Sequence, residues 1–301
     1  ITGLPRTGTS ILHELLGQDP DNRVPLAWEV RYPCPPPEAA TYRTDPRIAK
    51  ADEEIRLWNH IVPEYPTMHE LGAMIPVECI VLTMHEFRSD HLCGAHQVPT
   101  YAAWLAQADM RPAYRYHREM LQLLQWRNPA DRWVLKAPSH MASLDALLAV
   151  YPDAHIVQTH RDPLTVMASS ASILYATAWV RSDEVDAERI LGWFSGESYA
   201  YLLDGATQLR ESGSVDRAQF FDVRYQDLMR DPIGTIRSVY EHFGLPLSER
   251  TAASIRAYLQ AKPKGKHGAH RYSFADTGFD LDRERARFAA YQYRYDVPSE
   301  V

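Results

Sequence analysis

The sequence predicts an α/β fold in which a central, mostly parallel sheet is flanked by helices and a helical insert follows the first strand. Two observations indicate the sheet. A short apolar run at residues 1–4 passes through a Gly/Pro turn into a helical segment, and from residue 132 onward strand-like runs alternate with helical ones. A third indicates the insert, because residues 20–130 are proline-rich and then mainly helical.

Composition limits the class of protein. The chain has 301 residues, of which 45% are hydrophobic and 24% charged, as is usual for a soluble globular enzyme. We expect one domain over residues 1–301. The net charge of −7 argues against a general nucleic-acid-binding protein, so a polyanionic ligand must be held by a local group of Arg and Lys.

Other features of the sequence concern its compartment and its start. Three cysteines make no disulfide framework, so we expect a reducing, cytoplasmic location. We expect no signal peptide, since these residues show no such pattern, and no apolar run is long enough for a transmembrane helix. The sequence opens without methionine inside a predicted strand, so we expect further residues upstream of Ile1.

The opening residues predict a strand, a loop and a helix start: Ile1, Thr2, Gly3, Leu4, Pro5, Arg6, Thr7, Gly8, Thr9 and Ser10. Their spacing overlaps the GxxxxGK(S/T) nucleotide-binding loop, but Thr9 stands where that motif has lysine, and Arg6 places a cation inside the loop. Backbone N–H groups at such a turn favour an anion. We interpret the stretch as a phosphate or sulfate site in a P-loop-like fold. The alternative is a tight strand-to-helix turn.

The first half of the chain is predicted to be largely helical. The first helix covers residues 9–17 and ends at Gly17 and Pro20. Residues 23–47 are too rich in proline for a long helix, but Leu26-Ala27-Trp28-Glu29 resembles a packed loop. Further helices are expected at 45–61, 76–87, 99–108 and 112–126. The aromatic side chains here either pack in the core or line an apolar acceptor pocket: Trp58, Tyr65, Tyr101, Trp104 and Tyr114.

The second half alternates between strands and helices. Strands are expected at 132–136, 155–159 and 219–224. Helices are expected at 139–150, 163–174, 184–211 (one long helix or a pair), 232–243, 248–260 and 281–291.

Four polar groups follow predicted strands. They are Arg6 to Ser10, Lys136 to His140, His160-Arg161-Asp162 with Ser169 in the next helix, and Tyr225 to Asp227. Each alone has an ordinary explanation, such as a salt-bridged arginine, a helix cap or a hydrogen-bonded histidine. Because the carboxyl ends of parallel strands meet at one edge of a sheet, we expect the four groups to form one site.

These motifs together resemble the PAPS-dependent sulfotransferases (PAPS is 3′-phosphoadenosine 5′-phosphosulfate), in particular the bacterial branch with a P-R-S/T-G-T-S/T loop. The resemblance covers residues 1 to about 275 and implies PAPS as the donor. It assigns the 5′-phosphosulfate to the loop and the 3′-phosphate to the R-x7-S pair. The Y-x-D-L-x-x-D-P aromatic would contact adenine, and a late K-G-x-x-G-x-x-K/R loop would contact the 3′-phosphate. The matching residues are Arg6, Thr7, Gly8, Thr9 and Ser10; Arg161 and Ser169; Tyr225; and Lys264, Gly265, Gly268 and Arg271.

The first loop departs from the soluble animal enzymes of this family. Those enzymes have lysine in the loop and an aromatic residue directly after it, whereas this sequence has Arg6 and Ile11. Arginine at this place is similar to the bacterial and Golgi tyrosyl-protein branches. The change therefore indicates a different subfamily rather than a different function.

Sulfuryl transfer needs cations at the sulfate and a base for the acceptor hydroxyl. Arg6 and Lys136 are the candidate cations. The family resemblance offers two catalytic bases: His140, although its spacing is K-x3-H rather than K-x-H, and Glu29, some twenty residues beyond the loop. Histidine has the better intrinsic pKa, whereas Glu29 would need burial beside Trp28. The alternatives are that His140 caps a helix and that Glu29 pairs with an arginine.

We therefore predict a sulfotransferase that moves the sulfuryl group of PAPS to a hydroxyl of a small or lipid-like acceptor, whose pocket residues 20–110 would supply. No metal is expected, and the run from His91 to His96 has no second ligand cluster. The alternatives are a P-loop-type small-molecule or nucleoside kinase, which the missing lysine opposes, and a catalytically silent anion-binding module. The sequence identifies neither the acceptor nor the oligomeric state.

Overall fold

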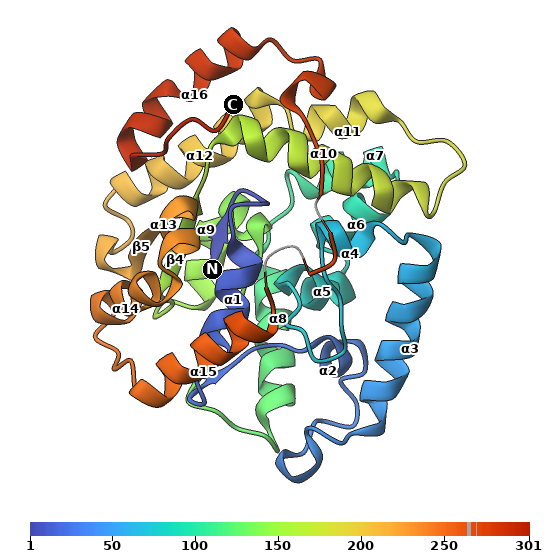
Figure 1. Cartoon of the computed structure of the whole chain (residues 1–301), viewed down its shortest axis with the longest axis vertical. Coiled ribbons are helices and arrows are strands. Elements are labelled where there is room, and N and C mark those ends of the chain that lie inside the picture. Colours follow the sequence, from blue (N-terminus) through green and yellow to red (C-terminus); the bar gives the residue numbers. More distant parts are fainter. Residues whose placement is uncertain (264–265, 269) are drawn as a thin grey trace.

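A three-stranded parallel sheet forms the centre of the computed structural model, which describes residues 1–263, 266–268 and 270–301 (Figure 1). Its order is β1 (Thr2–Gly3), β4 (Ile156–His160) and β5 (Phe220–Arg224). Thr2 lies opposite Gln158, and all five residues of β4 pair with β5. Every residue of β4 is buried, as expected for a central strand covered on both faces. The predicted parallel α/β fold is confirmed.

The predicted strand at 132–136 is divided between two pairings. Only β3 (Arg132–Trp133) is a regular strand, and it pairs in parallel with β2 (Asn22–Arg23) in a separate small sheet. Beyond it, the Ile1 nitrogen donates to the Leu135 carbonyl (2.7 Å), and the Ala137 N–H donates to the Ile1 carbonyl (3.2 Å). This is the bonding pattern of a parallel pair. It places Lys136 at the open edge of β1.

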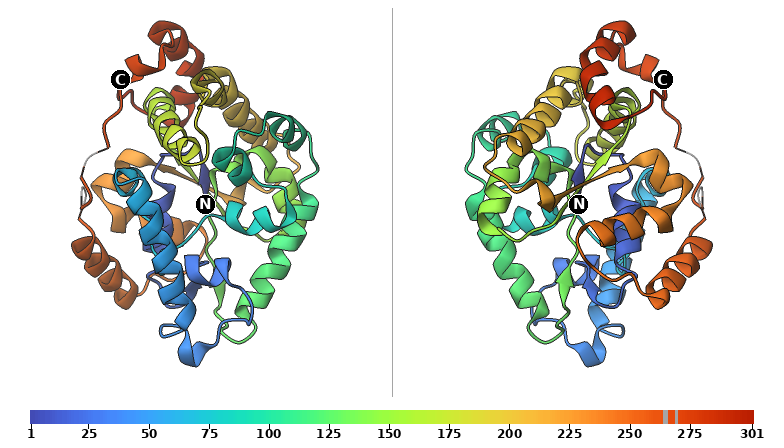
Figure 2. Two further views of the ribbon diagram at one scale, coloured as in Figure 1. Left: turned by 90° about the vertical axis from the view of Figure 1, so that its right-hand side faces the viewer. Right: turned by 90° about the vertical axis from the view of Figure 1, so that its left-hand side faces the viewer.

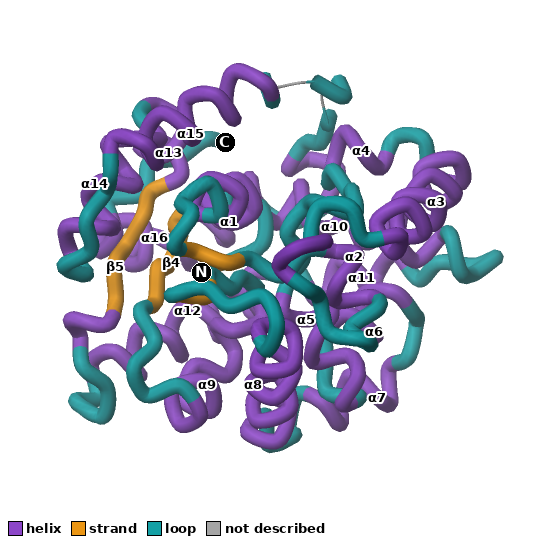
Figure 3. The backbone as a smooth tube through the Cα atoms, turned by 90° about the horizontal axis from the view of Figure 1, so that it is seen from below, coloured by secondary structure: helices purple, strands orange, loops and turns teal. Residues whose placement is uncertain are grey.

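Helices cover both faces of the central sheet. One core lies between the sheet and α1 (Thr9–Leu16), α13 (Tyr225–Arg230), α14 (Pro232–His242) and α15 (Glu249–Ala261). The other core lies under α9 (Leu144–Val150), α10 (Pro163–Trp179), α12 (Gly196–Glu211) and α16 (Leu281–Tyr295). Ile156 belongs to the second core and Val157 to the first, because successive strand residues face opposite sides. Figure 3 shows the strands between the two groups of helices.

The insert after the first strand is helical, as predicted, with its own small cores. Its helices are α2 (Ala27–Arg31), α3 (Pro46–Ile61), α4 (Tyr65–Met68), α5 (Cys79–Thr83), α6 (Asp90–Ala95), α7 (Pro99–Leu105) and α8 (Arg111–Gln125). The expected helix at 76–87 is shorter, because Pro76 and Val77 pair with Leu26 and Pro25 instead and a 3-10 turn (Met84–Glu86) ends it. Helices α2, α4, α6 and α13 were not predicted, since four to six residues carry too little periodicity; α2 replaces the packed loop expected at residues 26–29.

The remaining long segments follow the sequence prediction closely. The stretch at 184–211 is a helix pair, α11 (Ala187–Trp193) and α12. Helix α10 runs five residues beyond its predicted end at Leu174. Figures 1 and 2 show α16 lying across α12 at one end of the molecule. Within the described ranges, we find no helix with the length and apolarity that a membrane crossing requires. Cys34, Cys79 and Cys93 are unpaired.

His13 and His117 are buried in this fold as neutral rings. His13 on α1 bonds through Nε2 to the Val134 carbonyl (2.8 Å), and His117 on α8 bonds through Nδ1 to the Tyr151 hydroxyl (2.7 Å). Burial lowers the pKa of His13 to about 3 and that of His117 to about 4, from an ordinary 6.5. Between about pH 4 and 6.5 the unfolded chain therefore binds more protons than the folded chain. Stability should fall as the pH falls through this window.

Replacing His117 by glutamine should make the free energy of unfolding less steeply dependent on pH. Each histidine that charges only on unfolding adds up to about 1.4 kcal/mol per pH unit to that slope. Urea unfolding of wild type and His117→Gln between pH 4.5 and 6.5 measures the difference, with the exposed His60→Gln as control. The same slope in all three proteins would show that His117 is not buried as a neutral ring.

Candidate functional site

The loop between β1 and α1 is shaped by three residues with positive φ: Gly3 (141°), Arg6 (65°) and Gly8 (89°). A Cβ at Gly3 would lie 2.3 Å from Thr159 Oγ1 and 2.6 Å from the Thr159 carbonyl oxygen, so this position requires glycine. Thr7 is buried, and its hydroxyl donates to the Leu4 carbonyl (2.6 Å) and lies 2.5 Å from Thr159 Oγ1. Thr7 therefore fixes the loop against the end of β4.

Arg6 joins the loop to two other elements. Its Nε donates to Ser169 Oγ on α10 (3.0 Å), and its Nη1 donates to the carbonyl of Met68 at the end of α4 (2.6 Å). Ser169 is fully buried. Burial lowers the pKa of the Arg6 guanidinium, but an arginine keeps its charge in proteins. The loop therefore holds one half-buried cation between α4 and α10.

Arg161, directly after β4, lies on the other side of the loop. Its Nη1 donates to the Arg6 carbonyl (3.1 Å), and its guanidinium stacks 4.0 Å above the centre of the Tyr225 ring. The Tyr225 ring also packs on the loop, because a Cβ at Gly8 would lie 3.1 Å from its Cδ2. The structure thus brings together Arg6, Arg161, Ser169 and Tyr225, which the sequence places on four separate segments.

Lys136 lies at the start of α1 with a partner that the sequence analysis missed. Its Nζ donates to Ser10 Oγ (3.1 Å) and pairs with Glu78 Oε1 (2.5 Å). The Lys136 side chain is 2% exposed and that of Glu78, which precedes α5, is 23% exposed. Burial alone would raise the pKa of Glu78, but Lys136 and His69 outweigh it and hold that pKa below the ordinary 4.5. An ionised carboxylate therefore stands beside the loop.

A signal for Glu78 is present in the sequence. It is the single charged residue between Ala73 and Leu82, a stretch that is otherwise apolar except for Cys79. A charge in such a run is costly to bury unless it is paired, so its presence indicates a partner or a function.

Glu29, one of the two predicted bases, is held in a closed ion pair. Its Oε2 accepts from Arg23 Nη2 (2.5 Å), and its Oε1 accepts from the Leu26 N–H (3.1 Å) and the Tyr42 hydroxyl (2.9 Å). The side chain has no exposed surface. Burial raises the pKa of Glu29, and Arg23 opposes that shift. These contacts correspond to the alternative interpretation, in which Glu29 pairs with an arginine.

His140, the other predicted base, is also directed into the interior. It lies in a 3-10 turn, Pro138–Ser143, is 6% exposed, and bonds through Nδ1 to the hydroxyl of Tyr114 on α8 (2.9 Å). Burial lowers its pKa well below 6.5, so the ring is neutral at pH 7. Glu29 and His140 thus form their hydrogen bonds with residues of the insert. Lys136, which pairs with Glu78, instead contacts Ser10 at the end of the opening loop.

The late loop is described in part, since Lys264 and Gly265 lie outside the described residues. Gly268, with φ of 100°, is exposed, as is Arg271. A Cβ at Gly268 would lie 3.6 Å from the Thr67 methyl group of α4. His270 bonds through Nε2 to Ser172 Oγ on α10 (2.6 Å), one helical turn after the serine that contacts Arg6. The described part of this loop therefore reaches both elements that hold Arg6.

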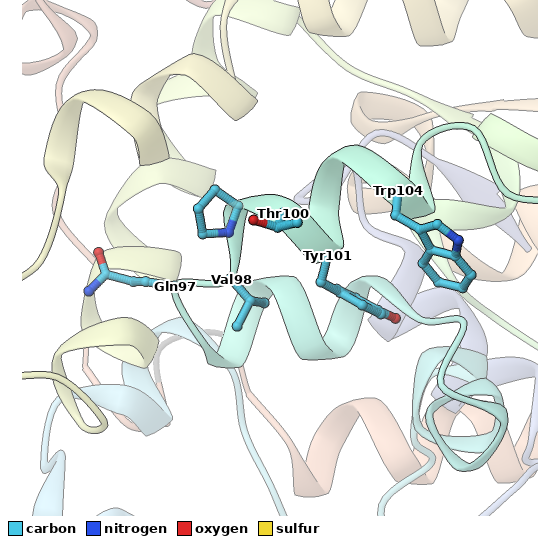
Figure 4. A pocket seen from close by; sticks show the side chains of 6 residues that line it. Gln97, Val98, Thr100, Tyr101 and Trp104 are labelled. Atoms are coloured by element: carbon cyan, nitrogen blue, oxygen red, sulfur yellow. The ribbon is translucent and has the colours of Figure 1, made fainter.

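An open depression of about 690 Å³ lies on α7 (Figure 4). Tyr101 and Trp104, two of the aromatics considered for an acceptor pocket, line it together with Gln97, Val98, Pro99 and Thr100. None of the residues that contact Arg6 or Lys136 belongs to its lining. Among the described residues, no group of three or more His, Cys, Asp or Glu side chains is arranged to hold a metal ion, and the run from His91 to His96 forms none.

Comparisons with known proteins match this chain almost throughout. A family model described as the sulfotransferase family matches residues 1–249. The crystal structure of sulfotransferase STF1 from Mycobacterium tuberculosis H37Rv is 36% identical with a TM-score of 0.81, covering 96% of this chain and 75% of that one. Sulfotransferase STF9 from Mycobacterium avium is 31% identical with a TM-score of 0.87, covering 99% and 76%.

Curated relatives are more distant. The omega-hydroxy-beta-dihydromenaquinone-9 sulfotransferases Stf3 of Mycobacterium bovis and Mycobacterium tuberculosis are each 26% identical over 284 residues, which is 86% of this chain. The chain spans 66% of the length of these relatives.

Replacing Gly8 by alanine should destabilise the loop. A side chain there costs roughly 1–2 kcal/mol in left-handed backbone, and its Cβ would crowd Tyr225 Cδ2 at 3.1 Å and Leu228 Cδ2 at 3.2 Å. Gly205→Ala is the matched control, because Gly205 is exposed inside α12 and a Cβ added there would have no atom within 4 Å. That change should stabilise the fold by about 1 kcal/mol. Urea unfolding measures both, and equal effects would contradict the packing of Tyr225 on Gly8.

Proposed function

This chain belongs to the sulfotransferase family, and we propose that it transfers the sulfuryl group of PAPS to a hydroxyl group of a lipid-like acceptor. One observation carries the proposal. Arg6 of the loop bonds to Ser169, and its carbonyl accepts from Arg161. Candidate residues for a 5′-phosphosulfate and for a 3′-phosphate are therefore in direct contact, as a nucleotide with both groups requires.

The donor would be held by this cluster. Arg6 to Ser10 and the N-terminal end of α1 would bind the 5′-phosphosulfate, since a helix N-terminus and its free N–H groups favour an anion. Arg161 and Ser169 would bind the 3′-phosphate, and Tyr225 would contact the adenine. Lys264, Gly265, Gly268 and Arg271 would add contacts to the 3′-phosphate.

In the proposed reaction the acceptor oxygen attacks sulfur as the bond from sulfur to the bridging phosphate oxygen breaks. Negative charge then grows on that bridging oxygen, and the products are a sulfate ester and 3′-phosphoadenosine 5′-phosphate (PAP). The half-buried Arg6 and the buried Lys136 would stabilise this charge, and they act more strongly in a site with little water. In-line transfer of this kind depends mainly on positioning and charge.

For the base we propose Glu78 rather than Glu29 or His140. Its carboxylate is partly exposed, ionised, and 2.5 Å from the lysine that contacts Ser10, whereas the two predicted bases are bonded inside the protein. A low pKa is compatible with this role, because the catalytic aspartate of protein kinases likewise accepts the proton of the attacking hydroxyl as a carboxylate. Lys136 would hold Glu78 in place.

The acceptor class is inferred from the insert and from relatives. Met68 and Glu78, both in the insert, reach the loop region, so an acceptor entering beside them would meet the donor. The curated relatives are named for a menaquinone acceptor, which supports a hydroxyl on an apolar molecule here. We place the reaction in the cytoplasm, in keeping with the three unpaired cysteines. Labelled PAPS with hydroxylated lipids, sterols, phenols and sugars tests the acceptor.

Arg161→Ala should weaken PAP binding by tenfold or more, because hydrogen bonds to a charged group contribute roughly 1.5–3 kcal/mol. Isothermal titration calorimetry with PAP measures the loss. Arg294→Ala is the control, since Arg294 forms a surface ion pair with Glu211 (2.6 Å) on α16 and α12. Equal PAP affinity in all three proteins would remove the 3′-phosphate assignment. Phosphoryl transfer from ATP without any binding of PAP would show that the protein is a kinase. The absence of transfer to any acceptor would show that it is a catalytically silent anion-binding module.

Glu78→Gln should lower kcat by about 10²–10⁴, the usual contribution of a general base, while PAP affinity changes little. Glu86→Gln is the control, because Glu86 pairs with Arg88 (2.8 Å) in the same part of the insert. The pKa of Glu78 lies below 4.5, so wild-type kcat should persist as the pH falls until Glu78 is protonated below that value. If Glu78→Gln retains activity and His140→Ala loses it, the role of general base belongs to His140.

A further inference from the structure

The carboxylate of Glu300 forms an ion pair with Arg161, the arginine that we assign to the 3′-phosphate. Glu300 Oε2 accepts from Arg161 Nη2 (2.7 Å), and both of its carboxylate oxygens lie 3.0 Å from Arg161 Nε. Gln226 Nε2 donates to the same carboxylate (2.7 Å). The two side chains of the ion pair are 13% and 23% exposed. Such a two-point, partly buried pair is stronger than an ordinary surface salt bridge.

Hydrogen bonds to residues 297–301 hold Glu300 in this position. Asp162, fully buried, accepts from the backbone N–H of Glu300 (2.7 Å) and of Val301 (3.3 Å). Arg285 on α16 pairs with Asp162 (2.8 Å) and donates to the Val301 carbonyl (2.8 Å). The Val297 carbonyl accepts from Gln292 Nε2 (3.1 Å). Glu300 is therefore placed by backbone bonds and not by its side chain alone.

The end of β4 is bound to this same part of the chain at three successive residues. His160 bonds through Nδ1 to the Tyr291 hydroxyl of α16 (2.9 Å), Arg161 binds Glu300, and Asp162 binds Arg285. The position of Arg161 and the position of Glu300 are thus set together.

We infer that Glu300 is an internal competitor of the donor, whose 3′-phosphate must displace the Glu300 carboxylate from Arg161. This inference rests on the proposed function. Arg161 uses Nη1 for the Arg6 carbonyl and its Nε–Nη2 edge for Glu300. Because Nη1 already bonds to the Arg6 carbonyl, the Nε–Nη2 edge is the pair of donors through which a phosphate could bind Arg161 at two points without breaking that bond. A carboxylate and a phosphate cannot share this edge, because two anions at hydrogen-bonding distance repel each other strongly.

The competition acts on substrate and product alike, since PAPS and PAP both carry the 3′-phosphate. Glu300 would weaken the binding of each and would speed the release of PAP by re-forming its pair with Arg161. A nucleotide without a 3′-phosphate, such as adenosine 5′-phosphate, leaves the pair intact and gains nothing from its removal. Comparing how a Glu300 variant changes the affinity for PAP and for adenosine 5′-phosphate therefore isolates the role of Glu300.

The experiment measures binding of PAP and of adenosine 5′-phosphate to wild type and Glu300→Gln by isothermal titration calorimetry, with PAP release followed by stopped flow. We expect PAP to bind about ten- to a hundredfold more tightly to the variant, with slower release, and adenosine 5′-phosphate to bind equally to both. Glu211→Gln is the control: it removes one negative charge from the exposed pair with Arg294 and should leave both ligands unchanged.

Unchanged or weaker PAP binding by Glu300→Gln would overturn the inference while leaving the proposed function in place. An equal gain for both nucleotides would also overturn it, because the effect would then be one of general charge. If neither wild type nor variant binds PAP, the proposed function fails and the inference fails with it. Thermal unfolding of each protein without ligand establishes that the variants are folded, and Glu300→Asp, which shortens the same carboxylate, should shift PAP affinity in the same direction as Glu300→Gln.

Discussion

The site depends on the close approach of the opening loop to the end of β4. Gly3 lies so near Thr159 that no side chain fits between them, and the hydroxyls of Thr7 and Thr159 meet at 2.5 Å. Since Arg161 follows β4 by one residue, this contact sets how far the loop lies from the next cation. A larger residue at position 3 would separate the two segments. The Arg6 carbonyl could then no longer accept from Arg161.

The buried side chains of Lys136 and Glu29 each have a partner of opposite charge. Lys136 is buried but bonds to both Glu78 and Ser10, and the fully buried Glu29 has three donors. Burying a charge without such partners would cost several kcal/mol. The difference between the two carboxylates is exposure, because Glu29 has none and Glu78 retains 23%. The same pairing that stabilises the fold thus leaves one carboxylate partly exposed.

Sequence patterns predicted the parallel sheet and the long helices, and they led us to expect four polar groups at strand ends, because each depends on local periodicity or on the geometry that all parallel sheets share. The environment of each carboxylate and imidazole was not predictable in this way. Tyr114 lies 26 residues from His140, and Lys136 lies 58 residues from Glu78. No local spacing encodes such partners. The sequence could therefore indicate which residue types the chemistry needs, but not which of them the fold turns inward.

The stretch from Met68 to Glu78 connects the insert to the proposed donor site. The Met68 carbonyl accepts from Arg6, Glu70 holds Lys262 at 2.7 Å and Lys266 at 3.3 Å beside the late loop, and Glu78 pairs with Lys136. Three residues of this eleven-residue stretch thus reach three separate parts of the site. A movement of this stretch would change the positions of the loop cation, the late loop and the proposed base together. Under the proposed function, an acceptor bound against this stretch would therefore lie next to the residues that bind the donor.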